Sequence, residues 1–166
     1  MIRLVGSHNL LIGKGCSKIR VGIAHNFLRT QMRGLMTSQD ATDYNKFHAG
    51  ITLCPHPDKK DKGGEDAAAV SETFIALADG VGGWSDNGVD PAKYSRELCG
   101  NIASLLAHED RGIKFMCNPK QLCIEAAKMQ KETGSSTCII ASLDREAPVL
   151  YTSNLGDSGY LLLRKT

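Results

Sequence analysis

The sequence predicts an α+β fold with mainly antiparallel sheets. Three short apolar segments of strand-like composition precede two helical segments, and three more strand-like segments follow them. At 166 residues, with 42% hydrophobic and 23% charged residues, the chain has the size and composition of one globular domain. No apolar run reaches the length of about 18 residues that a membrane-spanning helix needs, so we expect no such helix.

The segment before the predicted helices, residues 48–78, is predicted to contain a strand, a polar loop and a hairpin. Strand-like segments cover residues 48–54, 67–70 and 73–78, and a loop rich in Lys, Asp and Gly covers residues 55–64. The segment 73–78 is apolar enough to be buried on both faces. A turn at Ser71 and Glu72 would pair the last two strands, and this pairing would bring Asp66 and Asp79 to the same edge.

Two helices are predicted in the middle of the chain. Asp90 followed by Pro91 is typical of a helix start, and apolar residues at helical spacing continue to about His108. A second helix is predicted from Asn118 to Gly134. Beyond it, the period changes to that of strands, which predicts an antiparallel meander over residues 138–143, 148–153 and 160–163.

The first 39 residues differ in charge from the rest, because all 18 acidic residues lie at or after Asp40. This leader carries six basic residues, so residues 40–166 hold 14 basic and 18 acidic residues and a net charge of −4. A basic, acid-free leader is typical of a mitochondrial transit peptide. We therefore expect residues 1–39 to be a disordered, cleaved transit peptide.

Two other interpretations of the leader remain open. A secretory signal requires a continuous apolar core, whereas Gly13 and Lys14 interrupt the run that begins at Leu10. A basic tail could also contact RNA or a membrane without specificity. The six cysteines include no Cys-x-x-Cys pair, which favours a reducing compartment.

Carboxylates follow the ends of several predicted strands. The apolar run that begins at Phe74 ends at Asp79, and a glycine-rich turn starts at Gly80. Further acidic groups come from Glu65, Asp66 and the turn at Asp157. Carboxylate and carbonyl oxygens favour Mg²⁺ or Mn²⁺ over zinc or copper. A shared aspartate can bridge two such ions, which acidify a water that attacks phosphorus.

Other chemistries fit the sequence poorly. Zinc at Cys54 and His56 would need paired ligands that the sequence does not offer at useful spacing. No Ser-His-Asp or Cys-His pairing and no P-loop motif is evident. The glycines after Asp79 do not match the dinucleotide-binding pattern Gly-x-Gly-x-x-Gly.

Four motifs in order resemble the type 2C metal-dependent protein serine/threonine phosphatases. They are Gly64-Glu65-Asp66, Ala78-Asp79-Gly80-Val81-Gly82-Gly83-Trp84, Gly134-Ser135-Ser136-Thr137 and Asn154-Leu155-Gly156-Asp157-Ser158-Gly159. The resemblance covers residue 48 to the end, and the variant with Val81 is similar to the mitochondrial subgroup. It implies the N-terminal part of an αββα four-layer sandwich with two Mg²⁺ or Mn²⁺ ions between its sheets.

The resemblance also implies roles for individual residues. Asp79 would bridge the two ions as the catalytic metal ligand, Gly80 would offer its carbonyl to one ion, and Glu65 would help to hold that ion. Asp66 and Asp157 would support the ligands without direct contact with the metal.

Three departures from the family pattern stand out. Val81 replaces a histidine, and Asp61 stands where many members have a phosphate-binding arginine. Lys59, Lys60 or Lys62 could supply a charge next to the phosphate, and we assign this role to Lys62. The chain also ends before the family's later metal-binding aspartates, so we expect residues 40–166 to be the N-terminal half of the domain.

The resemblance implies hydrolysis of phosphoserine and phosphothreonine in mitochondrial proteins, in the matrix, by a water bound between the two ions. Phosphorylated proteins of coenzyme Q biosynthesis or of mitochondrial import are the partners that the subgroup suggests, and no nucleic-acid partner is expected. The alternative is a truncated, catalytically impaired pseudophosphatase that acts as a binding module.

Overall fold

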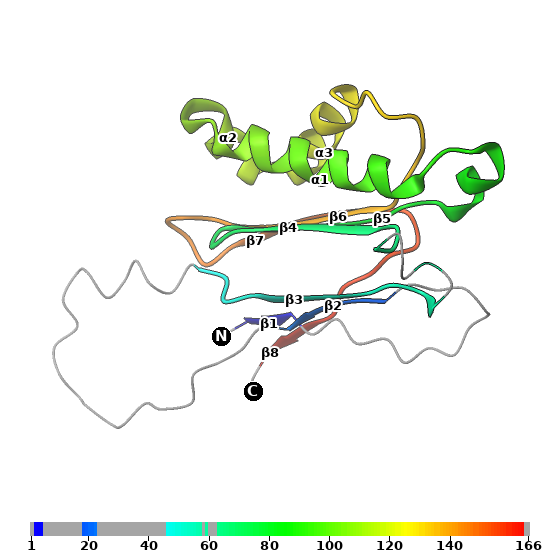
Figure 1. Ribbon diagram of the computed structural model, residues 1–166. Coiled ribbons are helices and arrows are strands. Elements are labelled where there is room, and N and C mark those ends of the chain that lie inside the picture. The colour runs from blue at the N-terminus through cyan, green and yellow to red at the C-terminus, as the bar shows by residue number, and fades with distance from the viewer. Residues whose placement is uncertain (1, 5–17, 23–45, 58, 60–62, 165–166) are drawn as a thin grey trace, which may run out of the picture.

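A four-stranded antiparallel sheet separates a layer of helices from a second layer of strands (Figure 1). The computed structural model describes residues 2–4, 18–22, 46–57, 59 and 63–164. The sheet has the strand order β4-β5-β6-β7, and each neighbouring pair is antiparallel. Its strands are β4 (Asp66–Val70), β5 (Phe74–Asp79), β6 (Cys138–Leu143) and β7 (Leu150–Leu155).

Three helices cover one face of this sheet, as Figure 1 shows. They are α1 (Pro91–Ala107), α2 (Glu109–Met116) and α3 (Pro119–Lys128). The core between the helices and the sheet includes Ile102, Leu122 and Ile140, each with no exposed surface. Burial of such side chains is the main force that holds a helix on a sheet.

The opposite face of the sheet carries a smaller cluster formed by Phe47, Ile75, Ala141 and Leu143. Side chains of β5 alternate between the two clusters, since Phe74 belongs to the larger one. This alternation is the two-residue period of a strand that is buried on both faces.

Two short strand pairs form the second layer of strands. Strand β2 (Lys18–Gly22) pairs with β3 (Gly50–Cys54), and β1 (Ile2–Leu4) pairs with β8 (Leu162–Arg164). Both pairs are antiparallel and lie on the side of the sheet away from the helices (Figure 1). Two of these strands, β1 and β2, lie within residues 1–39, the segment that the sequence predicts to be a transit peptide. The transit peptide remains a prediction.

The structure confirms the α+β class and several predicted elements. The strand predicted at residues 48–54 is β3, the two strands predicted before the helices are β4 and β5, and the helix that starts at Asp90 and Pro91 is α1. The Asp90 side chain accepts a hydrogen bond from the Ala92 amide at 3.1 Å, which is the capping contact that the sequence predicts.

The second predicted helix is shorter than expected. It begins after Asn118 as predicted, but α3 ends at Lys128 rather than at Gly134. The reason is tertiary, because the Glu97 carboxylate on α1 accepts hydrogen bonds from the amides of Lys131 and Glu132 at 3.0 and 2.9 Å. Those amides are therefore unavailable to a longer helix.

The predicted meander is wrong in its last strand. Strand β8 leaves the sheet and pairs with β1, whereas β7 is the last strand of the central sheet. Strand β7 also begins two residues later than predicted, because Asp144 organises the preceding turn. The Asp144 carboxylate accepts from the amides of Glu146 and Ala147 at 2.8 and 2.9 Å, and its own amide donates to the Val149 carbonyl at 2.9 Å.

Two helical elements were not predicted. Helix α2 contains Gly112, which lowers the helical signal of a polar segment. The glycine-rich turn forms the 3₁₀ helix η3 (Gly82–Asn87), which ends at Gly88 with a φ of 74°. Within the part of the chain that the structure describes, no helix has the length and apolar character to cross a membrane.

Truncation of the core should show how α3 is held. Leu122→Ala removes a side chain with no exposed surface, so we expect the free energy of unfolding to fall by about 3 kcal/mol. The matched variant is Ile124→Ala on the same helix, where the side chain is 40% exposed and the expected loss is under about 1 kcal/mol. Urea denaturation monitored by circular dichroism measures both, and equal losses would contradict this packing.

Candidate metal centre

The site begins where strands β4 and β5 pair at their outer ends. In this antiparallel register Asp66 lies directly opposite Asp79, as the hairpin predicted from the sequence requires. Further along the hairpin, Ala67 lies opposite Ala78 and Ala69 lies opposite Ala76, so two of the cross-strand pairs consist of small side chains. Two carboxyl groups are thus fixed side by side by backbone pairing alone.

The Asp66 carboxyl group is buried and lacks a hydrogen-bond donor. Its residue is 4% exposed, and among the described residues no donor reaches either carboxylate oxygen; the facing Asp79 carboxyl group can share a hydrogen bond with it only when one of the two groups carries a proton. Burial raises the pKa of Asp66 to about 7, and the negative charges of Asp79 and Glu65 add to this effect. A buried carboxylate without a partner is costly, so this position calls for a cation or a proton.

Thr137, the residue directly before strand β6, holds the backbone of Asp79. The Asp79 amide donates to the Thr137 hydroxyl at 3.1 Å, and its carbonyl accepts from the Thr137 amide at 2.9 Å. Thr137 in turn shares a hydrogen bond of 2.7 Å with the Ser158 hydroxyl, next to Asp157. Burial raises the pKa of Asp79, and the nearby charges of Asp157 and Glu65 raise it further, whereas a hydrogen bond shared with the Asp66 side chain and the charge of Lys59 lower it.

Gly80 permits a close approach of three backbone segments. A Cβ atom at this position would lie 2.7 Å from the Pro91 carbonyl oxygen and 2.8 Å from that of Glu65. The Gly80 amide donates to the same Glu65 carbonyl at 3.1 Å. Only a residue without a side chain fits at this position. Gly80 is also the residue after Asp79, so its carbonyl belongs to the same edge of the sheet.

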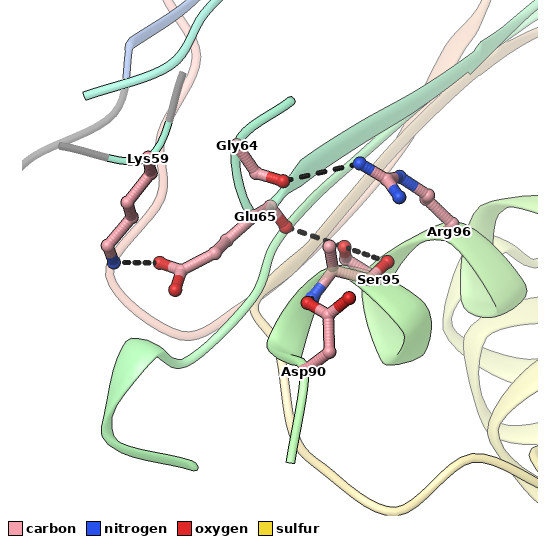
Figure 2. Close-up of polar contacts among 7 residues, drawn as sticks. Lys59, Gly64, Glu65, Asp90, Ser95 and Arg96 are labelled. Atoms are coloured by element: carbon pink, nitrogen blue, oxygen red, sulfur yellow. Dashed lines mark hydrogen bonds and ion pairs between the residues drawn. The ribbon is translucent and has the colours of Figure 1, made fainter. Parts of the chain in front are cut away.

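Helix α1 anchors the loop that carries Glu65. The Ser95 hydroxyl, which is fully buried, donates to the Glu65 carbonyl at 2.6 Å, and Arg96 donates to the Gly64 carbonyl at 3.3 Å. Figure 2 shows both contacts, with Ser95 and Arg96 reaching the loop from the helix. Neither residue was identified from the sequence, although a serine on the apolar face that Leu98 and Ile102 continue is a signal of a buried polar contact.

The Glu65 side chain points away from the helix and pairs with the Lys59 ammonium group (Figure 2). Glu65 itself is 8% exposed. Lys59, one of the three lysines considered from the sequence, is thus at the acidic cluster, whereas Lys60 lies outside the described residues. The predicted phosphate neighbour, Lys62, lies outside the described residues, and its role stays a prediction.

A cleft of about 330 Å³ adjoins this ion pair. Its lining consists of Lys59, Gly64, Glu65, Ser85, Gly88, Val89, Asp90 and Pro91. The cleft thus lies between the Glu65 loop, the end of η3 and the start of α1. It is large enough for one amino-acid side chain and has an ionic wall on one side.

A second contact fixes the glycine-rich turn on the far side of Asp79. The Trp84 indole donates to the Ser135 hydroxyl at 2.8 Å, and the Val81 amide donates to the Ser135 carbonyl at 3.0 Å. Ser135 belongs to the third of the four motifs that carry the family resemblance. The structure shows how it holds the turn in place.

The donor set fits a hard divalent cation in its chemistry. Glu65, Asp66 and Asp79 are acidic oxygen donors at one sheet edge, and the unpartnered, buried Asp66 marks a negative charge that the protein itself leaves uncompensated. No three His, Cys, Asp or Glu side chains in the described ranges are already gathered as metal ligands. Glu65, which is engaged by Lys59, would therefore have to turn toward the cation.

Curated relatives of this chain are type 2C protein phosphatases. "Probable protein phosphatase 2C 55" of Arabidopsis thaliana is 38% identical over 122 residues, which cover 72% of this chain and 25% of the relative. "Probable protein phosphatase 2C 26" of the same plant is 41% identical over 119 residues, or 70% of this chain and 38% of the relative. "Protein phosphatase PTC7 homolog fig" of Drosophila ananassae is 38% identical over 110 residues, or 61% and 32%.

A solved structure shares the same fold. The X-ray structure of the photosystem II phosphatase PBCP matches 64% of this chain and 41% of its own chain, with a TM-score of 0.58 and 37% sequence identity. No family model matches the chain. The chain spans 25% to 41% of the length of these relatives.

The raised pKa of Asp66 predicts a pH dependence of stability. Its folded-state pKa of about 7 lies above that of an unfolded aspartate, so this group favours folding at acid pH and loses that contribution as pH rises toward 7. In EDTA, the wild-type free energy of unfolding should therefore decrease from pH 5 to pH 8. Asp66→Asn should reduce this decrease by on the order of 2 kcal/mol.

Urea denaturation at the two pH values measures this difference. The matched control is Asp86→Asn, because Asp86 is exposed on η3 and should leave the pH dependence as in the wild type. If Asp66→Asn and Asp86→Asn behave alike, burial of the Asp66 charge is not the source of the effect.

Proposed function

We propose that this chain, which is related to the type 2C protein phosphatases over most of its length, forms part of a metal-dependent protein serine/threonine phosphatase. The observation that carries the proposal is the buried, unpartnered Asp66 carboxyl group opposite Asp79 at the sheet edge. The relatives named as protein phosphatases support the same activity class.

The residues at the edge would divide the work of holding two Mg²⁺ or Mn²⁺ ions. Asp79 would contact both ions, while Glu65 and the Gly80 carbonyl would hold one of them. Asp66 would add negative charge behind these ligands. When bound, such ions activate water at neutral pH and neutralise the charge of a transferring phosphoryl group.

The rest of the chain would keep these ligands in position. Thr137 binds both backbone groups of Asp79, so the carboxylate starts from a fixed strand end. Ser95 donates to the Glu65 carbonyl and so restrains the Glu65 backbone. Because these backbone positions are fixed, only the Glu65 side chain would have to reorient when a cation binds, and this reduces the reorganisation that catalysis would otherwise require.

The substrate class would be phosphorylated proteins. The cleft beside Glu65 has a volume of about 330 Å³, which suits one side chain of a bound polypeptide. Its wall contains the Lys59 ammonium group, and a positive charge there favours an approaching phosphate.

We place the site of action in the mitochondrial matrix. The basic, acid-free residues 1–39 support import. Phosphorylated proteins of coenzyme Q biosynthesis or of mitochondrial import would then be the candidate substrates.

Replacement of the bridging carboxylate is the direct test of the activity. Asp79→Asn should lower Mn²⁺-dependent hydrolysis of a phosphoserine or phosphothreonine peptide by about 10³-fold or more, because it removes a charged ligand shared by both ions. Release of inorganic phosphate by the purified chain, with and without EDTA, measures this loss. Asp86→Asn should retain the wild-type rate.

Hydrolysis that survives unchanged in Asp79→Asn would contradict the proposed site. A folded chain that releases no phosphate in any form would instead favour the binding-module interpretation. In that case, the function to measure is the binding of partner proteins by this chain in the absence of a phosphopeptide.

Import into mitochondria tests the leader. Residues 1–39 fused to a fluorescent protein should direct it to the matrix of isolated mitochondria, where it becomes protease-resistant. A variant with glutamine at Arg3, Lys14, Lys18, Arg20, Arg29 and Arg33 should remain outside, because the positive charges drive import. Equal import of both fusions, or of neither, would contradict a charge-driven transit peptide.

A further inference from the structure

The Lys59–Glu65 ion pair lies inside the candidate metal centre. The Glu65 side chain is 11% exposed and largely removed from water, whereas the Lys59 side chain is 35% exposed. A Cβ atom at Gly82 would lie 3.0 Å from the Lys59 ammonium nitrogen and 3.1 Å from Glu65 Oε2. The pair is therefore packed directly against the glycine-rich turn that follows Asp79.

The charge of Lys59 reaches the other carboxyl groups of the cluster. It opposes the upward shift in the pKa of both Asp66 and Asp79. Among these three carboxylates, nevertheless, only that of Glu65 contacts the ammonium group, and no described donor reaches either oxygen of Asp66. One cation is thus shared unequally among three carboxylates.

The Glu65 carboxylate is directed at Lys59, whose ammonium group donates to Glu65 Oε2. The positive charge of that ammonium group repels a divalent cation that approaches the same carboxylate. We propose that Lys59 is a built-in counter-ion, whose ammonium group neutralises Glu65 in the metal-free chain and must leave it before a divalent cation can bind there. This inference rests on the proposed function for the role of Glu65 as a ligand.

The ammonium group has a place to go when it leaves. Lys59 also lines the cleft, which would receive its head group. Lysine suits such an exchange, because its charge is carried on a flexible stem of four carbons. The ion pair would hold the Glu65 side chain in the metal-free state and would make cation binding weaker than the bare carboxylates would allow.

Chemical reactivity of Lys59 tests the exchange without any measurement of enzyme activity. Brief treatment of the full chain with acetic anhydride, followed by peptide mass spectrometry, gives the acetylation rate of Lys59 relative to the exposed Lys120 on α3. We expect Lys59 to react slowly in EDTA and at least about fivefold faster with saturating Mn²⁺. In Glu65→Gln, Lys59 should react rapidly without Mn²⁺ and show no further gain.

Mn²⁺ affinity, measured from the electron paramagnetic resonance signal of the free ion, gives a second readout. Lys59→Met should bind Mn²⁺ roughly tenfold more tightly than the wild type, because a charged competitor for Glu65 is lost. Lys59→Arg should retain weak binding, and Lys120→Met should match the wild type. In the Glu65→Gln background, Lys59→Met should bring no further gain, whereas a general effect of charge would persist there.

The outcomes separate this inference from the proposed function. If Mn²⁺ binds and Lys59 reactivity does not change, the counter-ion role is overturned and the metal site stands. A gain from Lys59→Met that survives in Glu65→Gln also overturns it. If neither the wild type nor Lys59→Met binds Mn²⁺ at millimolar concentration, the metal site fails and the inference fails with it.

Discussion

Pairing of Asp66 with Asp79 across the ends of β4 and β5 is the constraint on which the rest of the site depends. Backbone hydrogen bonds fix the register, and Asp66 is buried where it faces Asp79. The two carboxyl groups cannot separate without the loss of strand pairing. Their mutual repulsion is therefore built into the fold and can be relieved only by a proton or a cation.

The surrounding elements serve this constraint in different ways. Thr137 holds Asp79 through two hydrogen bonds, and Ser95 on α1 holds the backbone of Glu65. Gly80 allows the backbone after Asp79 to pack against the carbonyls of Glu65 and Pro91, because a side chain there would collide with both. The stability of the hairpin and the chemistry of its edge are consequently linked, and Lys59 supplies the one contact in the cluster that balances charge with charge.

Much of this arrangement could be predicted from local sequence. The continuous apolar run of β5 and the turn at Ser71 predict the hairpin and thereby the meeting of Asp66 and Asp79. Contacts between distant segments could not be predicted in the same way. The early end of α3 depends on Glu97, and the departure of β8 depends on its pairing with β1, and neither carries a local signal. The resemblance to a family supplied roles for residues, but it did not reveal the partner of Glu65.

The central claim is that the acidic edge of β4 and β5 binds divalent cations, and nuclear magnetic resonance with paramagnetic Mn²⁺ tests it most directly. Substoichiometric Mn²⁺ should broaden the amide signals of Glu65, Asp79 and Gly80 first, leave those of Ala107 and Leu143 sharp, and lose its effect on addition of EDTA. Broadening that starts elsewhere in the chain, or that affects all signals equally, would contradict the claim.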